Sequence, residues 1–313
     1  MNMTGVFGAG GFIGSALLRR LASRGHPIRA VGRKFNAEFR SYFPASIEFV
    51  EADLRDAKKA GSSLDGLDTV VYLIGSSAPS AQNKKIMSDL QEELIPHLAF
   101  IQTALQRGVR RFLFASSGGA IYGTDVPEPV TEDSSLAPIC SYGLIKLTIE
   151  NYLQMHRRID GLGAVILRFG NVYGPGQCFR RGQGLIPAVF HCVFQGIPLQ
   201  LRAGGQAIRD YVFIEDTIDA LEEALVNESA TGQILNIGSG KGHTSLEVVE
   251  KLENSLGVPV PRVMVPDHPT DIKVNILNIE KAARILGWKP RTELAEGLHR
   301  TVQWWRSEQR QDV

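Results

Sequence analysis

The sequence predicts an α/β fold, a doubly wound parallel sheet followed by a smaller α/β lobe. Strand-like and helix-like apolar patterns alternate over residues 3–115, and this alternation is typical of a parallel sheet covered by helices. The first strand pattern, at residues 3–7, runs into a glycine-rich turn and then into a helical pattern. Ligands of such sheets bind at the carboxyl ends of the strands, so we expect the site residues at that edge.

Length and composition exclude several classes of protein. A chain of 313 residues exceeds the usual size of one domain, so two domains or lobes are expected. The net charge of +1, without long runs of one sign, indicates no nucleic-acid groove, and no apolar stretch reaches the roughly 18 residues of a membrane span. Cys140, Cys178 and Cys192 have no CxxC spacing, which favours reduced thiols in a cytoplasmic protein over a disulfide or metal frame.

The glycine-rich turn predicts a dinucleotide site. Gly8, Gly11 and Gly14 follow the first strand, and Phe12 and Ile13 lie between the last two. Glycines here let backbone N–H groups approach a pyrophosphate, and the N-terminus of the following helix stabilises its charge. The spacing is GxxGxxG rather than GxGxxG. We therefore expect a Rossmann-type domain that binds NAD or NADP.

The end of the second strand bears on the choice between these cofactors. This strand pattern, at residues 28–31, ends in Gly32, Arg33 and Lys34. An NAD site usually carries an acid here for the ribose hydroxyl, whereas an arginine accommodates the 2′-phosphate of NADP. Arg33 therefore favours NADP. The alternative is that Arg33 stacks on the adenine or is simply solvated.

The third and fourth strands add further candidate contacts. The third, at residues 47–51, leads to Asp53 and Leu54. Asp53 could accept from the adenine amino group, with Leu54 against the ring, or it could cap the next segment. The fourth, at residues 68–74, ends in Gly75, where the backbone could pass close to the cofactor.

A tyrosine and a lysine four residues apart form the candidate reaction centre. Tyr142 and Lys146 lie in a helical pattern, so their side chains share one face, with Cβ atoms ~5–6 Å apart. A free tyrosine has a pKa of about 10, and a nearby cation would lower it, which makes the pair a candidate proton shuttle between alcohol and ketone. The fifth strand, at residues 111–115, ends in Ser116 and Ser117. We expect Ser117 to hydrogen-bond a substrate oxygen as the third catalytic residue, and Ser116 to contact the cofactor.

Together these motifs resemble one family. The GxxGxxG start, the serine pair before residues 121–123 (IYG) and the YxxxK pair are similar to the extended short-chain dehydrogenase/reductases, and among them to the nucleotide-sugar epimerases and dehydratases. Residues 167–176 (LRFGNVYGPG) resemble the family's LRxxNVYGPG signature, and residues 204–212 its GxGxQxRDFV motif. The resemblance implies that Asn171 contacts the substrate's diphosphate or sugar and that Arg209 clamps a phosphate bidentately. For Asp210 we expect a structural role.

The chain departs from the family pattern around the predicted catalytic serine. Counting from residues 122–123 places Gly118 at the usual Ser/Thr position, whereas counting from Tyr142 favours Ser117. Residues 118–120 read Gly-Gly-Ala where the dehydratases carry Thr-Asp-Glu. The carboxylates that carry protons during water elimination are therefore missing.

Two further departures concern the rest of the pocket. The family's RPGD reads HPTD at residues 268–271, which implies His268 and Asp271 as substrate contacts and leaves a second cation to Arg180, Arg181 or Arg262. The family's HLAA reads YLIG at residues 72–75, so the nicotinamide side is undefined by the resemblance.

By resemblance, the function is that of a nucleotide-sugar 4-epimerase, with UDP as the expected nucleotide. Tyr142 would take the proton of the sugar 4-hydroxyl, while Lys146 would lower the pKa of that tyrosine and bind the nicotinamide ribose. The hydride would go to a tightly bound NAD(P), and the 4-keto sugar would turn in the pocket before reduction. Surface-polysaccharide or O-antigen sugar biosynthesis is the expected setting. Two alternatives stay open: a 4-keto nucleotide-sugar reductase with exchangeable NADPH, which Arg33 favours, and a non-catalytic cofactor-binding member.

The last expectations concern domains and assembly. The dinucleotide-binding domain should comprise residues 1–172 and about 210–236, and the substrate lobe residues 173–209 and 237–313. The resemblance also implies a homodimer. An apolar stripe on the helix of Tyr142 could pair with its copy, together with the helix at residues 90–105, or it could cover its own sheet. The stripe consists of Ile145, Ile149, Tyr152 and Leu153.

Overall fold

A computed structural model describes residues 3–75, 86–124, 126–179, 184–267 and 271–311. In these residues, a seven-stranded parallel sheet has the order β10-β6-β5-β4-β1-β2-β3. Its strands are β1 (Thr4–Phe7), β2 (Ile28–Gly32), β3 (Glu48–Glu51), β4 (Thr69–Tyr72), β5 (Arg111–Ser117), β6 (Gly163–Phe169) and β10 (Ile234–Ile237). The predicted doubly wound parallel sheet is thereby confirmed.

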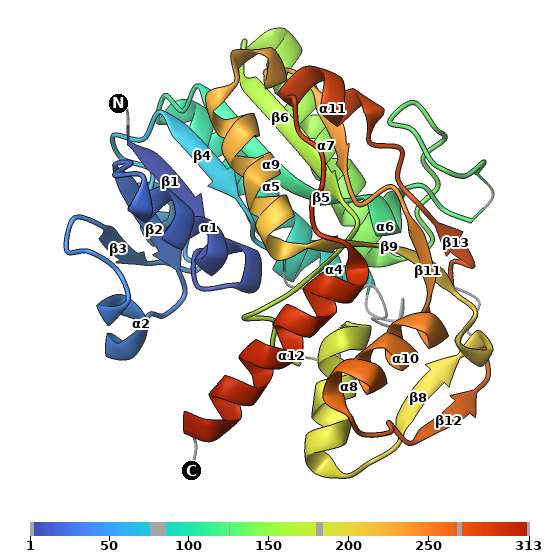
Figure 1. Cartoon of the computed structure of the whole chain (residues 1–313). Helices are drawn as coiled ribbons and strands as arrows, with labels where there is room; N and C mark the ends of the chain where they lie inside the picture. Colours follow the sequence, from blue (N-terminus) through green and yellow to red (C-terminus); the bar gives the residue numbers. More distant parts are fainter. Residues whose placement is uncertain (1–2, 76–85, 125, 180–183, 268–270, 312–313) are drawn as a thin grey trace.

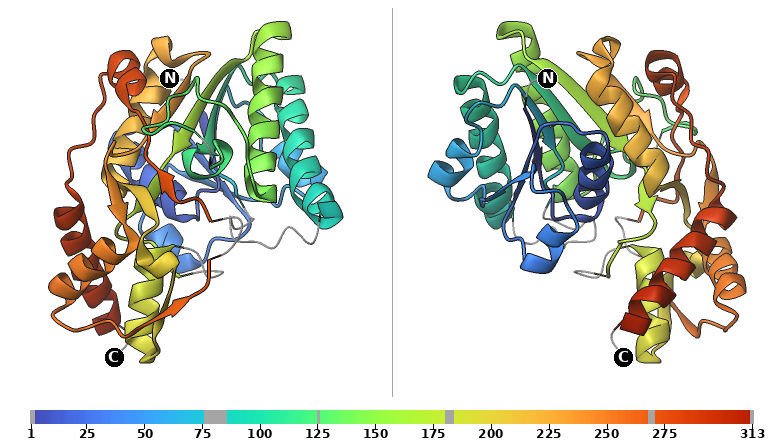
Figure 2. Two further views of the ribbon diagram at one scale, coloured as in Figure 1. Left: turned by 90° about the vertical axis from the view of Figure 1, so that its right-hand side faces the viewer. Right: turned by 60° about the vertical axis from the view of Figure 1, so that its left-hand side comes forward.

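Helices cover both faces of this sheet. On one face α5 and α7 lie side by side, and on the other α1 packs against α9 (Figure 1), an arrangement that Figure 2 shows from two further directions. The helices of this part are α1 (Phe12–Ser23), α2 (Ala37–Ser41), α3 (Ala57–Ser62), α4 (Ile86–Asp89), a π-helical stretch η1 (Leu90–Leu94), α5 (Ile95–Gln106), α6 (Gly118–Ile121), α7 (Ser141–Ile159) and α9 (Ile214–Val226).

Burial on both faces explains why β4 reads as a continuous apolar run. All four of its residues are buried, and alternate side chains of a strand point to opposite faces. Val71 accordingly belongs to the core on the α1 and α9 side, while Val70 and Tyr72 belong to the core beneath α5 and α7. A strand covered on both faces has no polar side to present.

The second lobe is built around short strands. A four-stranded sheet joins β11, β9 and β13, with β7 paired to β9, and a separate pair joins β8 to β12. The strands are β7 (Asn171–Tyr173), β8 (Leu199–Arg202), β9 (Ile208–Phe213), β11 (Gly242–Thr244), β12 (Arg262–Val265) and β13 (Val274–Asn275). The helices of this lobe are α8 (Leu185–Gln195), η2 (Ala203–Gly205), α10 (Ser245–Leu256) and α12 (Leu294–Gln311). By contrast, α11 (Glu280–Leu286) packs against β10 and α9 of the large sheet, and η3 (Glu228–Ala230) packs against α9 and α11 (Figure 1).

The termini of α10 follow directly from the sequence. Thr244 accepts from the backbone N–H of Glu247, whose side chain accepts in return from the backbone N–H of Thr244, which is a capping box. Gly257 ends the helix in the left-handed conformation that glycine adopts without strain. Both ends of α10 are therefore set by residues within the helix or directly beside it.

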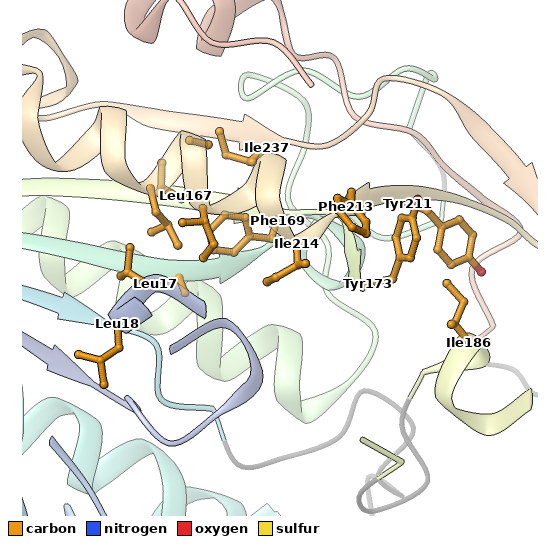
Figure 3. Packing of buried hydrophobic residues seen from close by; sticks show 14 of the residues in the cluster. Leu17, Leu18, Leu167, Phe169, Tyr173, Ile186, Tyr211, Phe213, Ile214 and Ile237 are labelled. Atoms are coloured by element: carbon orange, nitrogen blue, oxygen red, sulfur yellow. The ribbon is translucent and has the colours of Figure 1, made fainter. Parts of the chain in front are cut away.

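The two lobes share one hydrophobic core. A single cluster of buried residues extends from Leu17 and Leu18 of α1, through Phe169 at the end of β6, to Tyr211 of β9 and Ile186 of α8, as Figure 3 shows. Tyr211 and Tyr173 meet edge to face there, with ring centroids 6.3 Å apart. The boundary that we expected near residue 210 thus falls inside β9, and we propose to draw it after that strand.

Within the part of the chain that the structure describes, none of the helices is both long and apolar enough to span a bilayer.

Candidate active site

The glycine-rich turn leaves the N-terminus of α1 open to a ligand. Gly11 precedes the helix without any side-chain cap, and no acidic residue lies in the first turn. A Cβ on Gly14 would lie 2.1 Å from the carbonyl oxygen of Gly8, so only glycine lets the helix approach the turn this closely. Gly8 itself has φ +89° and would place a Cβ 3.1 Å from the backbone of Leu73. Uncapped N–H groups at a helix N-terminus suit a pyrophosphate, so the chain fits the dinucleotide that the sequence predicts.

Tyr142 and Ser117 come together at the carboxyl edge of the sheet. Ser117 is the last residue of β5 and precedes α6, while Tyr142 lies in the first turn of α7. Burial raises the pKa of Tyr142, and a hydrogen bond with the Ser117 side chain opposes that rise. The geometry therefore favours Ser117 over Gly118 as the partner of the phenol.

Lys146 lies one turn further along α7 and is almost fully buried. Its Nζ donates to the carbonyl oxygen of Ala115 at 2.8 Å and lies 5.8 Å from the centroid of the Tyr142 ring. A Cβ on Gly75 would lie 3.6 Å from this Nζ, so Gly75 adjoins the lysine. Burial lowers the pKa of Lys146 to about 8, against the opposing effect of the Glu150 and Glu93 carboxylates.

One expectation about this pair is wrong. We expected the lysine cation to lower the pKa of Tyr142, but in the structure burial is the largest influence and raises that pKa, and the opposing group is Ser117. Lys146 is not among the groups that shift the Tyr142 pKa, and its ammonium donates to the carbonyl oxygen of Ala115.

The Gly-Gly-Ala segment is shaped by the second lobe. A Cβ on Gly118 would lie 2.8 Å from both Cδ atoms of Leu277, whereas a Cβ on Gly119 would meet Asn275 Oδ1 at 3.8 Å and Ser117 Oγ at 3.9 Å, which are ordinary contacts. Asn275 Nδ2 donates to the carbonyl oxygen of Gly118 at 3.1 Å, while its buried Oδ1 has no partner among the described residues. Sequence reasoning missed Asn275, since a two-residue strand gives no periodic signal.

Ser116 does not take the expected position. Its hydroxyl is buried and donates to Glu150 of α7, on the side of β5 opposite to that of Ser117. Alternate residues of a strand point to opposite faces, so only one of two consecutive serines can face the crevice. The Ser116 side chain is therefore a structural contact rather than a cofactor ligand.

The segment after β2 carries two adjacent cations. Arg33 and Lys34 are both exposed after β2. Asp53 is engaged by the Arg55 side chain, through bonds of 3.0 and 2.6 Å, and this interaction lowers the Asp53 pKa to about 2. Asp53 Oδ1 also accepts from the backbone N–H of Arg55 at 3.0 Å, so it caps the turn that follows, which is the alternative that we considered, while Asp56 caps α3. Leu54 packs at the margin of the core.

Asn171 and Arg209 lie on neighbouring strands of the second sheet. Asn171 of β7 pairs in register with Tyr211 of β9, and Arg209 precedes Tyr211 by two residues and so lies on the same face. The buried Nδ2 of Asn171 has no partner within the described residues. Burial lowers the pKa of Arg209, opposed by Tyr211, Asp271 and Glu128. An unpaired amide and a partly buried guanidinium are groups that a diphosphate would satisfy.

Asp210 has the structural role that we expected. Its fully buried carboxylate accepts from the backbone N–H groups of Ser239 at 2.6 Å, Gly240 at 3.0 Å and Leu277 at 3.2 Å. It therefore joins β9 to the turn after β10 and to the segment that covers Gly118.

The last predicted contacts are only partly described. Asp271 forms an ion pair with Arg202 at 3.8 Å and acts on Arg209. Arg262 pairs with Glu253 of α10 at 3.1 Å. His268, Arg180 and Arg181 lie outside the described residues.

Sequence reasoning also missed an ion pair beneath the site. Glu150 of α7 and Arg168 of β6 meet at 2.7 Å with side chains that are 2% exposed. Arg168 lies in the quoted LRFGNVYGPG stretch, and Glu150 follows Lys146 by four residues. These positions could have suggested the pair, but only the sheet register brings them together.

The fold and the Ser117, Tyr142 and Lys146 arrangement define a dinucleotide-dependent enzyme of the extended short-chain dehydrogenase/reductase class. A model of the NAD dependent epimerase/dehydratase family matches residues 5–238, and the chain belongs to that family.

Individual relatives cover nearly the whole chain. It is 29% identical to a UDP-glucose 4-epimerase of Mycolicibacterium smegmatis over 96% of this chain and 98% of that protein. It is 30% identical to a dTDP-4-dehydro-6-deoxyglucose reductase of Escherichia coli over 95% of each. Among solved structures, a UDP-glucose 4-epimerase of Thermotoga maritima with UDP-glucose superposes with a TM-score of 0.90 at 29% identity, over 98% of this chain and 99% of that one.

Proposed function

We propose that this protein is a UDP-sugar 4-epimerase that works with bound NAD. The observation that carries the proposal is the meeting of Ser117, Tyr142 and Lys146 beside Gly75, at the carboxyl edge of a sheet whose glycine turn suits a pyrophosphate. The epimerases of Mycolicibacterium smegmatis and Thermotoga maritima support the nucleotide and the reaction.

The residues divide the chemistry between them. Bound NAD supplies a site that accepts a hydride from the sugar and returns it. Tyr142 takes the proton of the sugar hydroxyl and later gives it back, as general base and then general acid. Ser117 hydrogen-bonds the phenol and favours its ionised form. Arg209 and Asn171 hold the diphosphate while the keto sugar turns, so that both faces of the sugar reach the same groups.

The Gly-Gly-Ala segment argues against a dehydratase. Elimination of water needs an acid and a base beside the sugar, and residues 118–120 offer neither. Oxidation followed by reduction at one carbon needs a bound NAD for the hydride, and a single tyrosine with its neighbours for the proton. The absence of these carboxylates therefore favours epimerisation over dehydration.

The test is turnover of UDP-glucose without added cofactor. We expect NMR to detect UDP-galactose, and we expect the Tyr142→Phe variant to lose roughly 10²–10⁴-fold in rate while its thermal unfolding is nearly unchanged. Mass spectrometry of small molecules released from the denatured protein should find NAD without a 2′-phosphate. A wild-type protein that leaves UDP-glucose and other UDP-sugars unchanged, or a fully active Tyr142→Phe variant, would refute the proposal.

A reductase is the second candidate, and the cations after β2 favour it. Arg33 and Lys34 are exposed where an NAD site usually carries an acid, and the Escherichia coli relative is a reductase. This candidate predicts stoichiometric oxidation of added NADPH by a 4-keto nucleotide sugar. It also predicts that Arg33→Ala raises the KM for NADPH and leaves that for NADH unchanged.

We further propose a homodimer formed through α7 and α5. The residues expected at that interface were partly wrong, because Ile145, Ile149 and Leu153 are buried against the protein's own sheet. The outward stripe of α7 consists instead of Leu144, Tyr152, Met155 and Ile159, which are 54, 41, 40 and 67% exposed.

The oligomeric state tests this interface. We expect light scattering to give a dimer for the wild type and a monomer for Ile159→Glu. The matched control is Phe194→Glu on α8, where an equally exposed phenylalanine, at 62%, lies on the other lobe. A wild-type monomer, or a dimer that survives Ile159→Glu, would contradict the proposal.

The proposed setting is nucleotide-sugar supply for surface polysaccharides in the cytoplasm, and the three free cysteines suit a reducing compartment.

A further inference from the structure

A buried ionic assembly lies directly beneath the reaction centre. Arg168 Nη2 donates to Glu150 at 2.7 Å, and its Nε lies 3.2 Å from both carboxylate oxygens. Ser116 also donates to Glu150. Ser116 and Arg168 are register partners on the adjacent strands β5 and β6, so two strands present their donors to one helical carboxylate.

This assembly fixes α7 on the sheet. Lys146 donates to the carbonyl oxygen of Ala115, and Glu150, one turn later, accepts from Ser116. Two consecutive residues of β5 therefore bind two consecutive turns of α7, which sets the register of the helix that carries Tyr142.

The other end of Arg168 holds the serine side of the site. Its Nη1 donates to the Tyr122 hydroxyl at 2.9 Å, and Tyr122 donates in turn to Asn236 Oδ1 of β10 at 2.6 Å. Tyr122 directly follows α6, and Ser117 directly precedes it. One guanidinium is thus linked to both elements that carry the proton-transfer groups.

Charge gives Glu150 a second effect. A buried ion pair is weak evidence for stability, because its desolvation offsets its attraction. Within the described residues, the carboxylates that act on Lys146 are Glu150, on the same helix α7, and Glu93, on the neighbouring η1, and both oppose the effect of burial. His97 of α5 also interacts with the lysine, and burial lowers the pKa of His97.

We propose that Glu150, held by Arg168 and Ser116, is a positioning residue of the reaction centre, which sets the register of α7 and keeps the buried Lys146 ammonium protonated. The inference rests on the proposed function, in which Lys146 lies beside Tyr142 in the reaction centre. Glu150 reaches neither substrate nor cofactor and acts only through its neighbours.

The pH dependence of stability reads out the charge of Lys146 without any substrate. Lys146 has a pKa of about 8 in the folded protein, against about 10.4 for a free lysine. Between these values the unfolded chain binds more protons, so stability rises with pH. Removal of the Glu150 charge lowers the folded-state pKa further, and the rise should then begin at lower pH.

The first experiment compares thermal unfolding of the wild type and Glu150→Gln from pH 6 to 9.5. Glutamine keeps an acceptor for Ser116 and removes the charge. We expect the onset of the rise to move down by roughly one pH unit, and we expect this shift to vanish when Lys146→Met is present in both proteins. The matched control is Asp216→Asn on α9, a buried carboxylate that accepts from the backbone of Arg291 and Thr292. It should lower Tm equally at every pH.

A second variant covers the case in which Glu150→Gln does not fold because Arg168 is left unpaired. Glu150→Gln combined with Arg168→Gln removes both charges, and it should shift the onset in the same direction by less. The proposal would be overturned if plots of Tm against pH for the variants ran parallel to that of the wild type. It would also be overturned if the shift in onset persisted when Lys146 is replaced by methionine.

Turnover provides the functional arm. The basic limb of kcat/KM for UDP-glucose should move to lower pH in Glu150→Gln, whereas a merely structural role would lower kcat/KM by the same factor at every pH. If the wild type turns over neither UDP-glucose nor other UDP-sugars, the proposed function fails, and the unfolding experiment still decides the role of Glu150.

Discussion

Gly118 offers a quantitative test of how closely Leu277 packs against the start of α6. An alanine Cβ at this position would lie 2.8 Å from both Cδ atoms of Leu277 and 3.3 Å from the carbonyl oxygen of Arg168. Leu277 is fully buried and its backbone is bound to Asp210, so it has little room to move. Overpacking of this kind costs roughly 1–3 kcal/mol.

A helical glycine gains about 0.5–1 kcal/mol on replacement by alanine, which offsets part of that cost. Gly118→Ala should therefore destabilise the protein by roughly 1–2 kcal/mol, which corresponds to a Tm lower by a few degrees. Gly119→Ala is the matched control in the same helix, because its Cβ would make only ordinary contacts at 3.8 and 3.9 Å. We expect its Tm to be unchanged or slightly higher.

A double-mutant cycle assigns the cost to Leu277. Leu277→Val removes both Cδ atoms and should destabilise the wild type while relieving the Gly118→Ala variant, with a coupling energy of roughly 0.5–3 kcal/mol. Chemical denaturation of the four proteins measures it. Equal stabilities of Gly118→Ala and Gly119→Ala, or the absence of coupling, would show that the Leu277 contact does not select glycine.

Two further predictions concern single side chains. Ser117→Ala should lower kcat for UDP-glucose by roughly 10-fold or more, because it removes the group that opposes the rise of the Tyr142 pKa. The Tm should not change. Activity equal to that of the wild type would mean that Ser117 is not the partner of the phenol. Asp210→Asn should destabilise the protein by roughly 1–3 kcal/mol, because the amide NH₂ would face the backbone N–H groups that the carboxylate accepts from. Thermal unfolding at neutral pH measures it, and an unchanged Tm would contradict the buried geometry.

Local pattern was sufficient for the elements that depend on neighbours in the chain. The capping box of α10 and the glycine turn before α1 are set by residues within a few positions of each other. The shared face of Tyr142 and Lys146 follows from helical spacing alone. These features could therefore be predicted without knowledge of the tertiary structure.

Features that depend on sheet register could not be predicted. Ile145, Ile149 and Leu153 form one apolar stripe of α7, but a second stripe contains Leu144 and Ile159. Periodicity does not say which of the two faces the sheet. The structure buries the first and exposes the second.

The same limit applied to the charges at the site. Burial of the phenol raises the Tyr142 pKa, and the Lys146 ammonium donates to the carbonyl oxygen of Ala115. The contact between Glu150 and Arg168 requires β5 and β6 to be adjacent and aligned. Both facts involve residues that are distant in the sequence, for which helical spacing carries no information.

The interleaved connectivity of the small lobe limits how this protein can change its substrate. Its strands come from residues 171–173, 199–213, 242–265 and 274–275, and between them the chain returns to the large sheet at β10. No single cut separates the lobe as a fragment, and no simple fusion could graft it onto another enzyme. New specificity must then arise by replacement of individual side chains in place, and not by exchange of a module.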